Sequence, residues 1–327
     1  MLNSNTPVLF LVFNRPETTQ KVFEAIRLVK PQQLFIAADG ARPNIPGEKE
    51  LVEEVRNIVK NIDWPCEWYT LYRQEHLGCG KAVSEAINWF FNYVEKGIIL
   101  EDDTLPNQSF FEFCELMLDK YKEDERIAHI NGANFQLGEK WGKSSYFFSN
   151  YPMVWGWATW RRAWQQYEYQ MENYPQTSKQ EDFWDLLNSR GEINYWENIF
   201  QTMYNGFKSG INAKDTWDYQ WIYTCWKNKW LAITPNINLV TNLGFGEGAT
   251  HTKEESLVSY LPNSELKEMI HPNKIIPNKE ADSKLYKVYF NPSPRVINRI
   301  RNIVYKILPS SIISKLRLLR RKYFANL

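Results

Sequence analysis

The sequence predicts an α/β fold in which a mainly parallel sheet is flanked by helices. Short apolar runs alternate with segments of helical periodicity, the order is β-α-β-α-β-α-β, and polar residues follow the apolar runs. The expected strands cover 7–13, 33–40, 66–73 and 98–103, and the expected helices cover 18–30, 48–62 and 81–94. Ligands bind at the carboxyl ends of strands in such sheets, so the residues that follow each strand are the first candidates for a site.

The fourth of these strands ends in three adjacent carboxylates. Residues 97–106 read GIILEDDTLP, in which an apolar run is followed by Glu101, Asp102 and Asp103, and Pro106 is expected to end any further pairing. Burying even one of these charges unpaired costs on the order of several kcal/mol, so a cation is expected beside them. A hard divalent cation, Mn²⁺ or Mg²⁺, suits such oxygen ligands and would bridge a carboxylate to nucleotide phosphates. The alternative is a solvated acidic turn.

The usual glycine-rich phosphate loops are absent from the sequence. The turn after the first strand, FNRPETT (13–19), has no glycine, which excludes the G-x-G-x-x-G fingerprint there, and no G-x-x-x-x-G-K-[ST] motif occurs. In HLGCGKAV (76–83), Gly78 and Gly80 either turn the chain into the third helix or place Lys81 beside an anion.

Composition describes a folded protein of a reducing compartment. Hydrophobic residues make up 43% and charged residues 24%, which argues against disorder. The 14 tryptophans fit either a surface for flat ligands such as sugars and bases or a plain core. Four cysteines (Cys66, Cys79, Cys114 and Cys225) lack metal-type spacing, so we expect reduced thiols and a cytoplasmic location. The N-terminus lacks signal-peptide features, and no apolar segment reaches about 18 residues.

The order of several short blocks resembles a GT-A fold glycosyltransferase. FNRP, Asp39-Gly40, HLGCGKAVSEAINWFF (76–91) and ILEDD follow one another, with EDD where that superfamily has its D-x-D motif. WGWATWRRAW (155–164), WDYQW (217–221) and LVTNLGFGEGATH (239–251) resemble later blocks of the inverting N-acetylglucosaminyltransferase that initiates complex N-glycans, and of bacterial family 2-like sugar transferases. The resemblance covers roughly residues 7–255.

This resemblance implies roles for individual residues. Asp103 would bind the metal, and His251, in a glycine-rich loop, would add a metal or phosphate contact; the alternative for His251 is a structural role. Asp102 and Glu101 would contact the ribose and donor sugar or orient the metal's waters. Asp39 would accept from the edge of a base such as uracil, and Arg15 would face the diphosphate. The remaining expected nucleotide-sugar contacts are Asn14, Arg73 and Lys81.

An inverting transfer also needs a general base on the acceptor side. The segment AKDTWDYQWIYTCW (213–226) offers Asp215 and Asp218, and a helix is expected to start at Asp215-Thr216. Either aspartate could cap that helix, and capping is the expected role of Asp215. Asp218 stands where the resembled enzyme has its W-D stretch, so Asp218 is predicted as the base. No Ser-His-Asp or Cys-His set supports hydrolase chemistry.

The tryptophan block at 155–164 permits two interpretations. Trp155, Gly156 and Trp157 precede an expected helix and would form a floor for the donor sugar, because carbohydrate C–H faces stack on indole and glycine permits close approach. Alternatively, the tryptophans pack at a helix start against the sheet, a role that fits Trp160 and Trp164 equally well.

Together these features predict a metal-dependent, inverting glycosyltransferase that moves a sugar from a nucleotide-diphosphate sugar, with UDP favoured, to a glycan or lipid-linked acceptor of a surface polysaccharide. The transferase domain would span 1–290, with a nucleotide-binding half at 1–105 and an acceptor half at 106–255. The alternatives are a sugar-phosphate nucleotidyltransferase, which should have a glycine-rich basic loop after the first strand, and a non-catalytic nucleotide-sugar or glycan-binding module. Neither nucleic acid binding nor an oligomeric state is predicted.

The last segment, 291–327, is predicted to be a basic amphipathic helical extension. It contains nine Lys or Arg and no acid, which leaves 30 basic against 38 acidic residues for the rest of the chain. Pro309 divides it into two pieces, whose apolar residues recur at helical spacing. The apolar positions are Val296, Ile300, Ile303, Val304 and Ile307, and Ile312, Ile313, Leu316, Leu318 and Leu319. Either this stripe packs on the domain or a partner subunit, or it lies on the inner face of a membrane.

Membrane attachment through this extension is testable by sedimentation with anionic liposomes. The full chain should pellet at low salt, because each cationic side chain near an anionic leaflet contributes on the order of 1 kcal/mol. A chain that ends near Asn291 should stay in the supernatant. Equal partitioning of the two chains would contradict the attachment.

Overall fold

The computed structural model describes residues 5–210, 214–244, 258, 261–293, 300 and 303. The strands are β1 (Val8–Val12), β2 (Gln33–Ala38), β3 (Glu67–Tyr72), β4 (Lys96–Glu101), β5 (Thr104–Pro106), β6 (Ile127–Asn131), β7 (Tyr146–Ser149), β8 (Trp157–Trp160), β9 (Leu231–Pro235) and β10 (Val240–Asn242). The helices are α1 (Pro16–Val29), α2 (Glu48–Ile58), α3 (Cys79–Tyr93), α4 (Gln108–Lys120), α5 (Arg161–Trp164), α6 (Tyr174–Thr177), α7 (Arg190–Lys208), α8 (Asp218–Lys227), α9 (Lys279–Leu285) and the π-helix η1 (Tyr286–Phe290).

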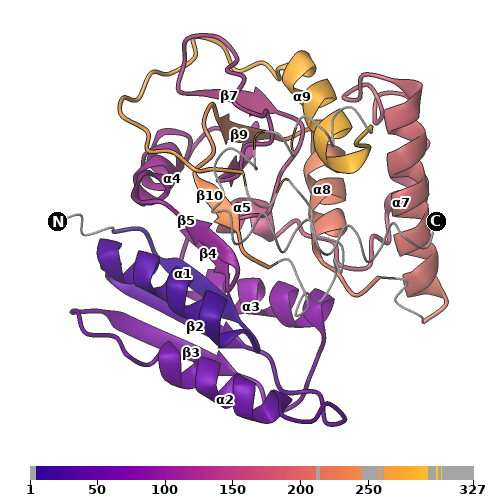
Figure 1. Cartoon of the computed structure of the whole chain (residues 1–327). Helices are drawn as coiled ribbons and strands as arrows, with labels where there is room; N and C mark the ends of the chain where they lie inside the picture. Colours follow the sequence, from indigo (N-terminus) through magenta and orange to yellow (C-terminus); the bar gives the residue numbers. More distant parts are fainter. Residues whose placement is uncertain are drawn as a thin grey trace, which may run out of the picture.

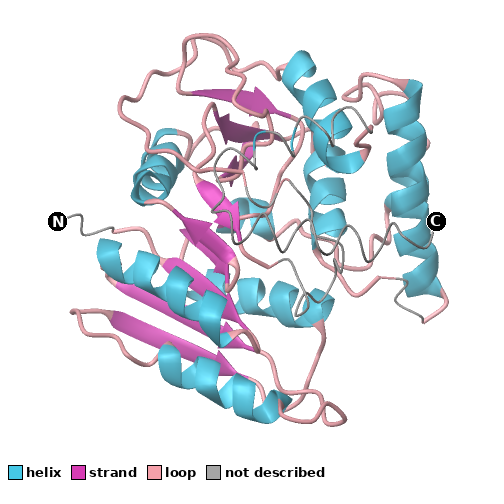
Figure 2. Ribbon diagram, viewed as in Figure 1, coloured by secondary structure: helices cyan, strands magenta, loops and turns pink. Residues whose placement is uncertain are grey.

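Eight strands form one sheet in the order β3-β2-β1-β4-β8-β6-β9-β7 (Figures 1 and 2). β3, β2, β1 and β4 are parallel neighbours, and only β8 and β7 run against the other six strands. The predicted α/β class, the mainly parallel sheet and its flanking helices are therefore confirmed. The seven elements expected before residue 104 are all present, with ends that move by a few residues. The sheet runs through both expected halves, 1–105 and 106–255.

Helices cover both faces of the sheet because its central strands are apolar on both sides. In β1, Val8, Phe10 and Val12 belong to one hydrophobic cluster, whereas Leu9 and Leu11 belong to another. The first cluster is completed by α1, α2 and α4. The second is completed by α3, α5, α7 and α8, of which α7 and α8 lie to the right of the strands in Figure 1. Because β1, β2 and β4 are parallel, their carboxyl ends lie at the same edge of the sheet.

The tryptophan block forms a strand where a helix start was expected. β8 pairs antiparallel with β4, from Lys96–Trp160 to Ile99–Trp157, and also pairs with β6. Trp157 belongs to the cluster on the α8 face and Trp160 to the cluster on the α4 face. Two bulky side chains three residues apart on opposite faces fit the two-residue period of a strand, and the helix α5 begins only at Arg161.

Two smaller expectations about element ends were also wrong. Pro106 does not end pairing, because β5 forms an antiparallel ribbon with β10 in which Pro106 faces Val240. Proline is tolerated there since this ribbon has only two strands. The helix expected from Asp215-Thr216 begins at Asp218, with Trp217 before it.

Most of the basic extension lies outside the described residues. Ile300 and Ile303 of the expected apolar stripe are described: Ile300 is buried in the cluster shared by α3, α7 and α8, and Ile303 packs against the same cluster. These two contacts favour packing on the domain for this part of the first piece. The second piece, 310–327, is not described, and membrane attachment stays a prediction. Among the helices of the described part, none is long and apolar enough to cross a membrane.

Candidate functional site

A cavity of about 750 Å³ opens at the carboxyl ends of β1, β2 and β4. Its first side is formed by the residues that follow these strands, including Arg15, Asp39 and the triplet Glu101–Asp103. Its second side comes from the later part of the chain, through Tyr195 of α7, Asp218 of α8 and η1. The cavity thus lies where open α/β sheets bind ligands, and it joins residues more than 200 positions apart in the sequence.

Arg15 provides the positive charge beside the carboxylate triplet. Its Nη2 lies 2.9 Å from Oδ1 of Asp102, and its Nη1 lies 2.5 Å from Oδ2 of Asp103. Burial by itself would lower the pKa of Arg15, but the two aspartates outweigh it, and the guanidinium stays charged. The pairing follows from the register, because β1 lies next to β4 with Leu11 opposite Glu101.

The three carboxylates of the triplet have different partners. Both oxygens of Asp102 are engaged, since Oδ2 also accepts from the backbone N–H of Phe13 at 3.0 Å. Asp103 uses Oδ2 for Arg15, and no described residue bonds its Oδ1. The carboxylate of Glu101 has no described partner, and burial followed by the nearby charge of Asp103 raises its pKa. Asp102 therefore anchors Arg15 and β1, whereas Glu101 and Asp103 remain available to a ligand.

The segment after β10 runs directly past Asp103. The N–H of Leu243 donates to the backbone oxygen of Asp103 at 2.7 Å. A Cβ at position 244 would lie 1.9 Å from Oδ2 of Asp103 and 2.7 Å from Nη1 of Arg15, so any other residue there would have to displace these two side chains. The block 239–251 therefore begins beside the triplet. Its continuation, with His251, lies outside the described residues.

The carboxylates at Asp103 fit a divalent cation if they supply only part of its coordination shell. No group of three or more His, Cys, Asp or Glu side chains in the described ranges is arranged to hold a metal ion. Mg²⁺ commonly takes one or two carboxylates and completes its shell with phosphate oxygens and water. The open oxygen of Asp103 and the unpartnered Glu101 meet that pattern, whereas Asp102 does not.

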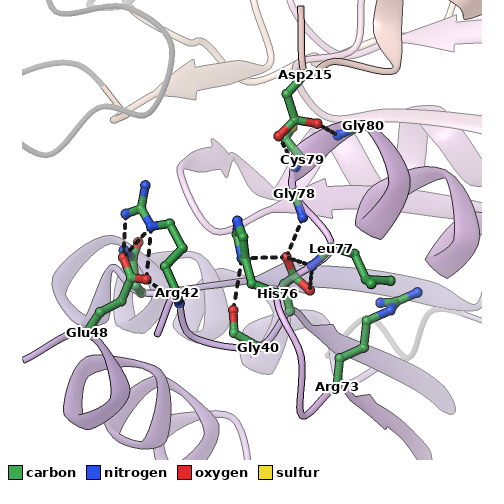
Figure 3. Close-up of polar contacts among 12 residues, drawn as sticks. Gly40, Arg42, Glu48, Arg73, His76, Leu77, Gly78, Cys79, Gly80 and Asp215 are labelled. Carbon is green, nitrogen blue, oxygen red and sulfur yellow. Dashed lines mark hydrogen bonds and ion pairs between the residues drawn. The ribbon is translucent and has the colours of Figure 1, made fainter. Parts of the chain in front are cut away.

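Asp39 lines the cavity, but the protein already uses its carboxylate. Both oxygens accept from the N–H of Leu77 at 3.1 Å, and Oδ2 also accepts from that of Gly78 at 3.1 Å. Nδ1 of His76 lies 2.9 Å from Oδ2 of Asp39 and 3.0 Å from the carbonyl oxygen of Gly40 (Figure 3). Asp39 thus fixes the β3–α3 loop over the end of β2, and the expected contact to a base edge would compete with these bonds.

Of the other residues expected to contact a nucleotide sugar, Arg73 and Trp155 line the cavity. The four that do not are Asn14, Lys81, Gly156 and Trp157. Asn14 donates to Oε1 of Glu48 at 2.8 Å, and Lys81 is 57% exposed beside Glu85. Trp157 is fully buried and stacks on Trp217, because β8 places it in the core. Gly156, with φ +60°, packs against Val240. The interpretation of Gly156 and Trp157 as a sugar floor is therefore wrong.

Several lining residues carried no signal in the sequence. Arg42 lines the cavity, and Glu48 holds it through hydrogen bonds to Nε and Nη2 (Figure 3). His76 lines the cavity, and so do Tyr195 and Tyr289. They occur outside the recognisable blocks or, for His76, beside more conspicuous glycines. The order of strands and helices alone does not predict which of their side chains face a cavity.

Asp215 caps a helix, but not the expected one. Its oxygens accept from the N–H groups of Cys79 at 2.8 Å and Gly80 at 2.7 Å, the first two residues of α3 (Figure 3). A Cβ on Gly78, where φ is +82°, would lie 2.5 Å from Oδ2 of Asp215. Gly78 and Gly80 therefore leave space for the carboxylate of Asp215, which lies 135 residues after Gly80 in the sequence.

Asp218 lies in the first turn of α8, on the cavity wall. The hydroxyl of Thr216 donates to its Oδ1, and Thr216 follows the Asp215 cap. No described residue bonds Oδ2 of Asp218. One oxygen is thus held by the protein, and the other is available to a ligand in the cavity.

Comparison with known proteins gives little similarity. No protein-family model matches the chain, and no curated protein is significantly similar in sequence. Among solved structures, HddC from Yersinia pseudotuberculosis is similar over 50% of this chain and 80% of its own, with a TM-score of 0.30 and 11% identity. A UDP-glucose pyrophosphorylase complexed with UDP-glucose is similar over 51% of this chain and 79% of its own, with a TM-score of 0.29 and 11% identity. Similarity this low carries no inference about activity.

The remote cap gives a prediction about stability. Asp215→Ala should lower the free energy of unfolding by about 1 kcal/mol, because two N–H groups of α3 lose their acceptor. Urea denaturation measures this change, with Asp185→Ala, at an exposed position, as the matched control. Equal losses in the two variants would show that the cap does not stabilise the protein.

Proposed function

We propose that this protein is an inverting, metal-dependent glycosyltransferase of GT-A fold that uses a nucleotide-diphosphate sugar, with UDP the favoured nucleotide. One observation carries the proposal: a single cavity contains the Arg15–Asp102–Asp103 cluster on one side and Asp218, with an available carboxylate oxygen, on the other. A donor with an anionic leaving group and an acceptor with a hydroxyl to deprotonate need this pair of features.

The residues of the cavity would divide the reaction between its two sides. Arg15 would bind the diphosphate, since a guanidinium presents several N–H donors to phosphate oxygens. Oδ2 of Asp218 would take the proton from the acceptor hydroxyl while the acceptor's oxygen forms a bond to the anomeric carbon. The bond from the anomeric carbon to the diphosphate oxygen breaks at the same time, and attack from the opposite side inverts the centre.

Asp103, with Glu101 beside it, would hold the cation. A bound Mn²⁺ or Mg²⁺ would neutralise the negative charge that develops on the leaving diphosphate. Asp102 keeps Arg15 and the end of β1 in place, so it would shape the site and not bind the metal. The different hydrogen-bond partners of Asp102 and Asp103 support this proposed division of roles.

Two other functions make different demands on the first turn. A sugar-phosphate nucleotidyltransferase needs a glycine-rich basic loop after β1, but the chain has Phe13-Asn14-Arg15-Pro16 and enters α1 at once. A non-catalytic binder has no need of Asp218. Donor hydrolysis without acceptor, and pyrophosphate release from a nucleoside triphosphate with a sugar 1-phosphate, separate the three functions.

The proposed setting is the assembly of a surface polysaccharide or glycolipid at the inner face of a membrane. The basic extension would bring the protein to an anionic surface where a lipid-linked acceptor is presented. Substitution of Arg320, Arg321 and Lys322 by glutamate tests this attachment without removing Ile300 from the core.

Nucleotide binding should depend on a divalent metal through Asp103. Asp103→Ala should abolish the gain in nucleoside diphosphate affinity that Mn²⁺ gives, with the fold unchanged, because the metal loses its carboxylate. Calorimetric titration with UDP, with and without chelator, measures the dependence. Wild-type affinity that chelator leaves unchanged would contradict the metal.

Asp218, and not Asp215, should act as the base. Asp218→Asn keeps the shape of the side chain and loses its basicity, so turnover should fall by roughly 10²–10⁴-fold with donor binding nearly unchanged. Asp215→Asn is the matched control, since Asp215 caps α3. A large loss of turnover in Asp215→Asn alone would overturn the assignment.

A further inference from the structure

Part of the cavity wall is aromatic. Trp155, Tyr195, Tyr219 and Tyr289, here called the aromatic wall, all line the cavity and are half-buried. They come from four places: the loop before β8, α7, α8 and the π-helix η1. Trp155 and Tyr219 belong to blocks that carry the sequence resemblance, whereas Tyr195 and Tyr289 do not.

Ring contacts fix the position of the aromatic wall. The rings of Trp155 and Tyr289 meet edge-on with centroids 5.5 Å apart, and Phe135 contacts both, at 5.0 and 4.7 Å. Tyr195 contacts Phe290 at 6.0 Å. Tyr289 is displayed by a π-helix, a backbone form that is rare and frequently found at functional sites. The wall is thus a preformed surface.

The tyrosines of the wall offer hydroxyl groups that no residue in the described ranges uses. No described residue bonds the hydroxyl of Tyr195, Tyr219 or Tyr289. Burial is the main cause that raises the pKa of each of the three, and the nearby charge of Asp218 contributes to each, so they remain neutral donors. Asp218 and the three tyrosines line the same cavity, and no described residue bonds the three hydroxyls.

We propose that the aromatic wall binds a pyranose ring of the acceptor, which makes the acceptor's reacting end a carbohydrate. The inference rests on the proposed function, since it takes Asp218 as the base. Apolar C–H faces of a sugar pack on indole and phenol rings, and its hydroxyls pair with tyrosyl hydroxyls and a carboxylate. An acyl chain in the same place would leave three half-buried hydroxyls without partners, which is unfavourable.

The hydroxyls are tested by a variant that keeps every ring, in which Tyr195, Tyr219 and Tyr289 are all replaced by Phe. The matched control is Tyr204→Phe, which lies on α7 with Tyr195 but does not line the cavity. The probes are octyl glycosides of glucose, galactose, mannose and N-acetylglucosamine, added to protein saturated with UDP and Mn²⁺ so that the donor side is occupied. Saturation-transfer NMR locates the contacts on each probe and measures its affinity.

We expect saturation on the pyranose protons of at least one glycoside in the wild-type protein and in Tyr204→Phe. The triple variant should bind that glycoside at least about tenfold more weakly and bind UDP within twofold of wild type, because each lost hydrogen bond contributes about 1 kcal/mol. Saturation confined to the octyl chain, equal affinity in the triple variant, or no glycoside binding by UDP-loaded protein would overturn the inference alone. A wild-type protein that binds no nucleoside diphosphate would overturn the proposed function and this inference with it.

Discussion

The ion pairs of Arg15 with Asp102 and Asp103 are the interaction on which the polar side of the cavity depends. Glu101 ends β4, whose four middle residues are buried, and Asp102 and Asp103 follow it; the mutual repulsion and desolvation of these carboxylates would oppose the burial of β4 without a cation beside them. Arg15 meets them because β1 and β4 are neighbours and because α1 begins at Pro16, where the hydroxyl of Thr19 bonds the carbonyl oxygen of Arg15 at 2.7 Å. The side chain of Arg15 thus compensates the buried negative charge and also presents positive charge to the cavity.

Long-range contacts join this polar side to the later part of the chain. Asp215 caps α3 from the segment that leads into α8, and Thr216 then holds one oxygen of Asp218. β10 pairs antiparallel with β5, and the N–H of Leu243, which follows β10, donates to the backbone oxygen of Asp103. This pairing keeps β10 beside the triplet. The position of Asp218 relative to Arg15 is therefore set by backbone capping and strand pairing, which are more rigid than contacts between long surface side chains.

Sequence patterns predicted features that are local. Apolar and alternating runs predicted the strands β1 to β4, and helical periodicity predicted α1, α2 and α3. Because Arg15, Asp39 and the triplet come at the ends of predicted strands, they were expected at one edge of the sheet. Roles that depend on a distant partner were not predictable. Asn14 bonds Glu48, Asp39 holds the loop at 76–78, and Asp215 caps a helix 135 residues away. In each case the side chain is polar and short, and many partners would satisfy it.

The sequence by itself determined the alternation of strands and helices, the sheet edge that carries the site, and the excess of negative charge after β4, because these follow from periodicity and from neighbours in the chain. Only the tertiary structure decided which cation faces that charge, that Trp157 belongs to a buried strand, and that Tyr195 and Tyr289 reach the same cavity as Asp218. The physical reason is that a tryptophan or tyrosine gains equally from burial in a core and from a cavity wall, and only the packing of distant elements selects between them.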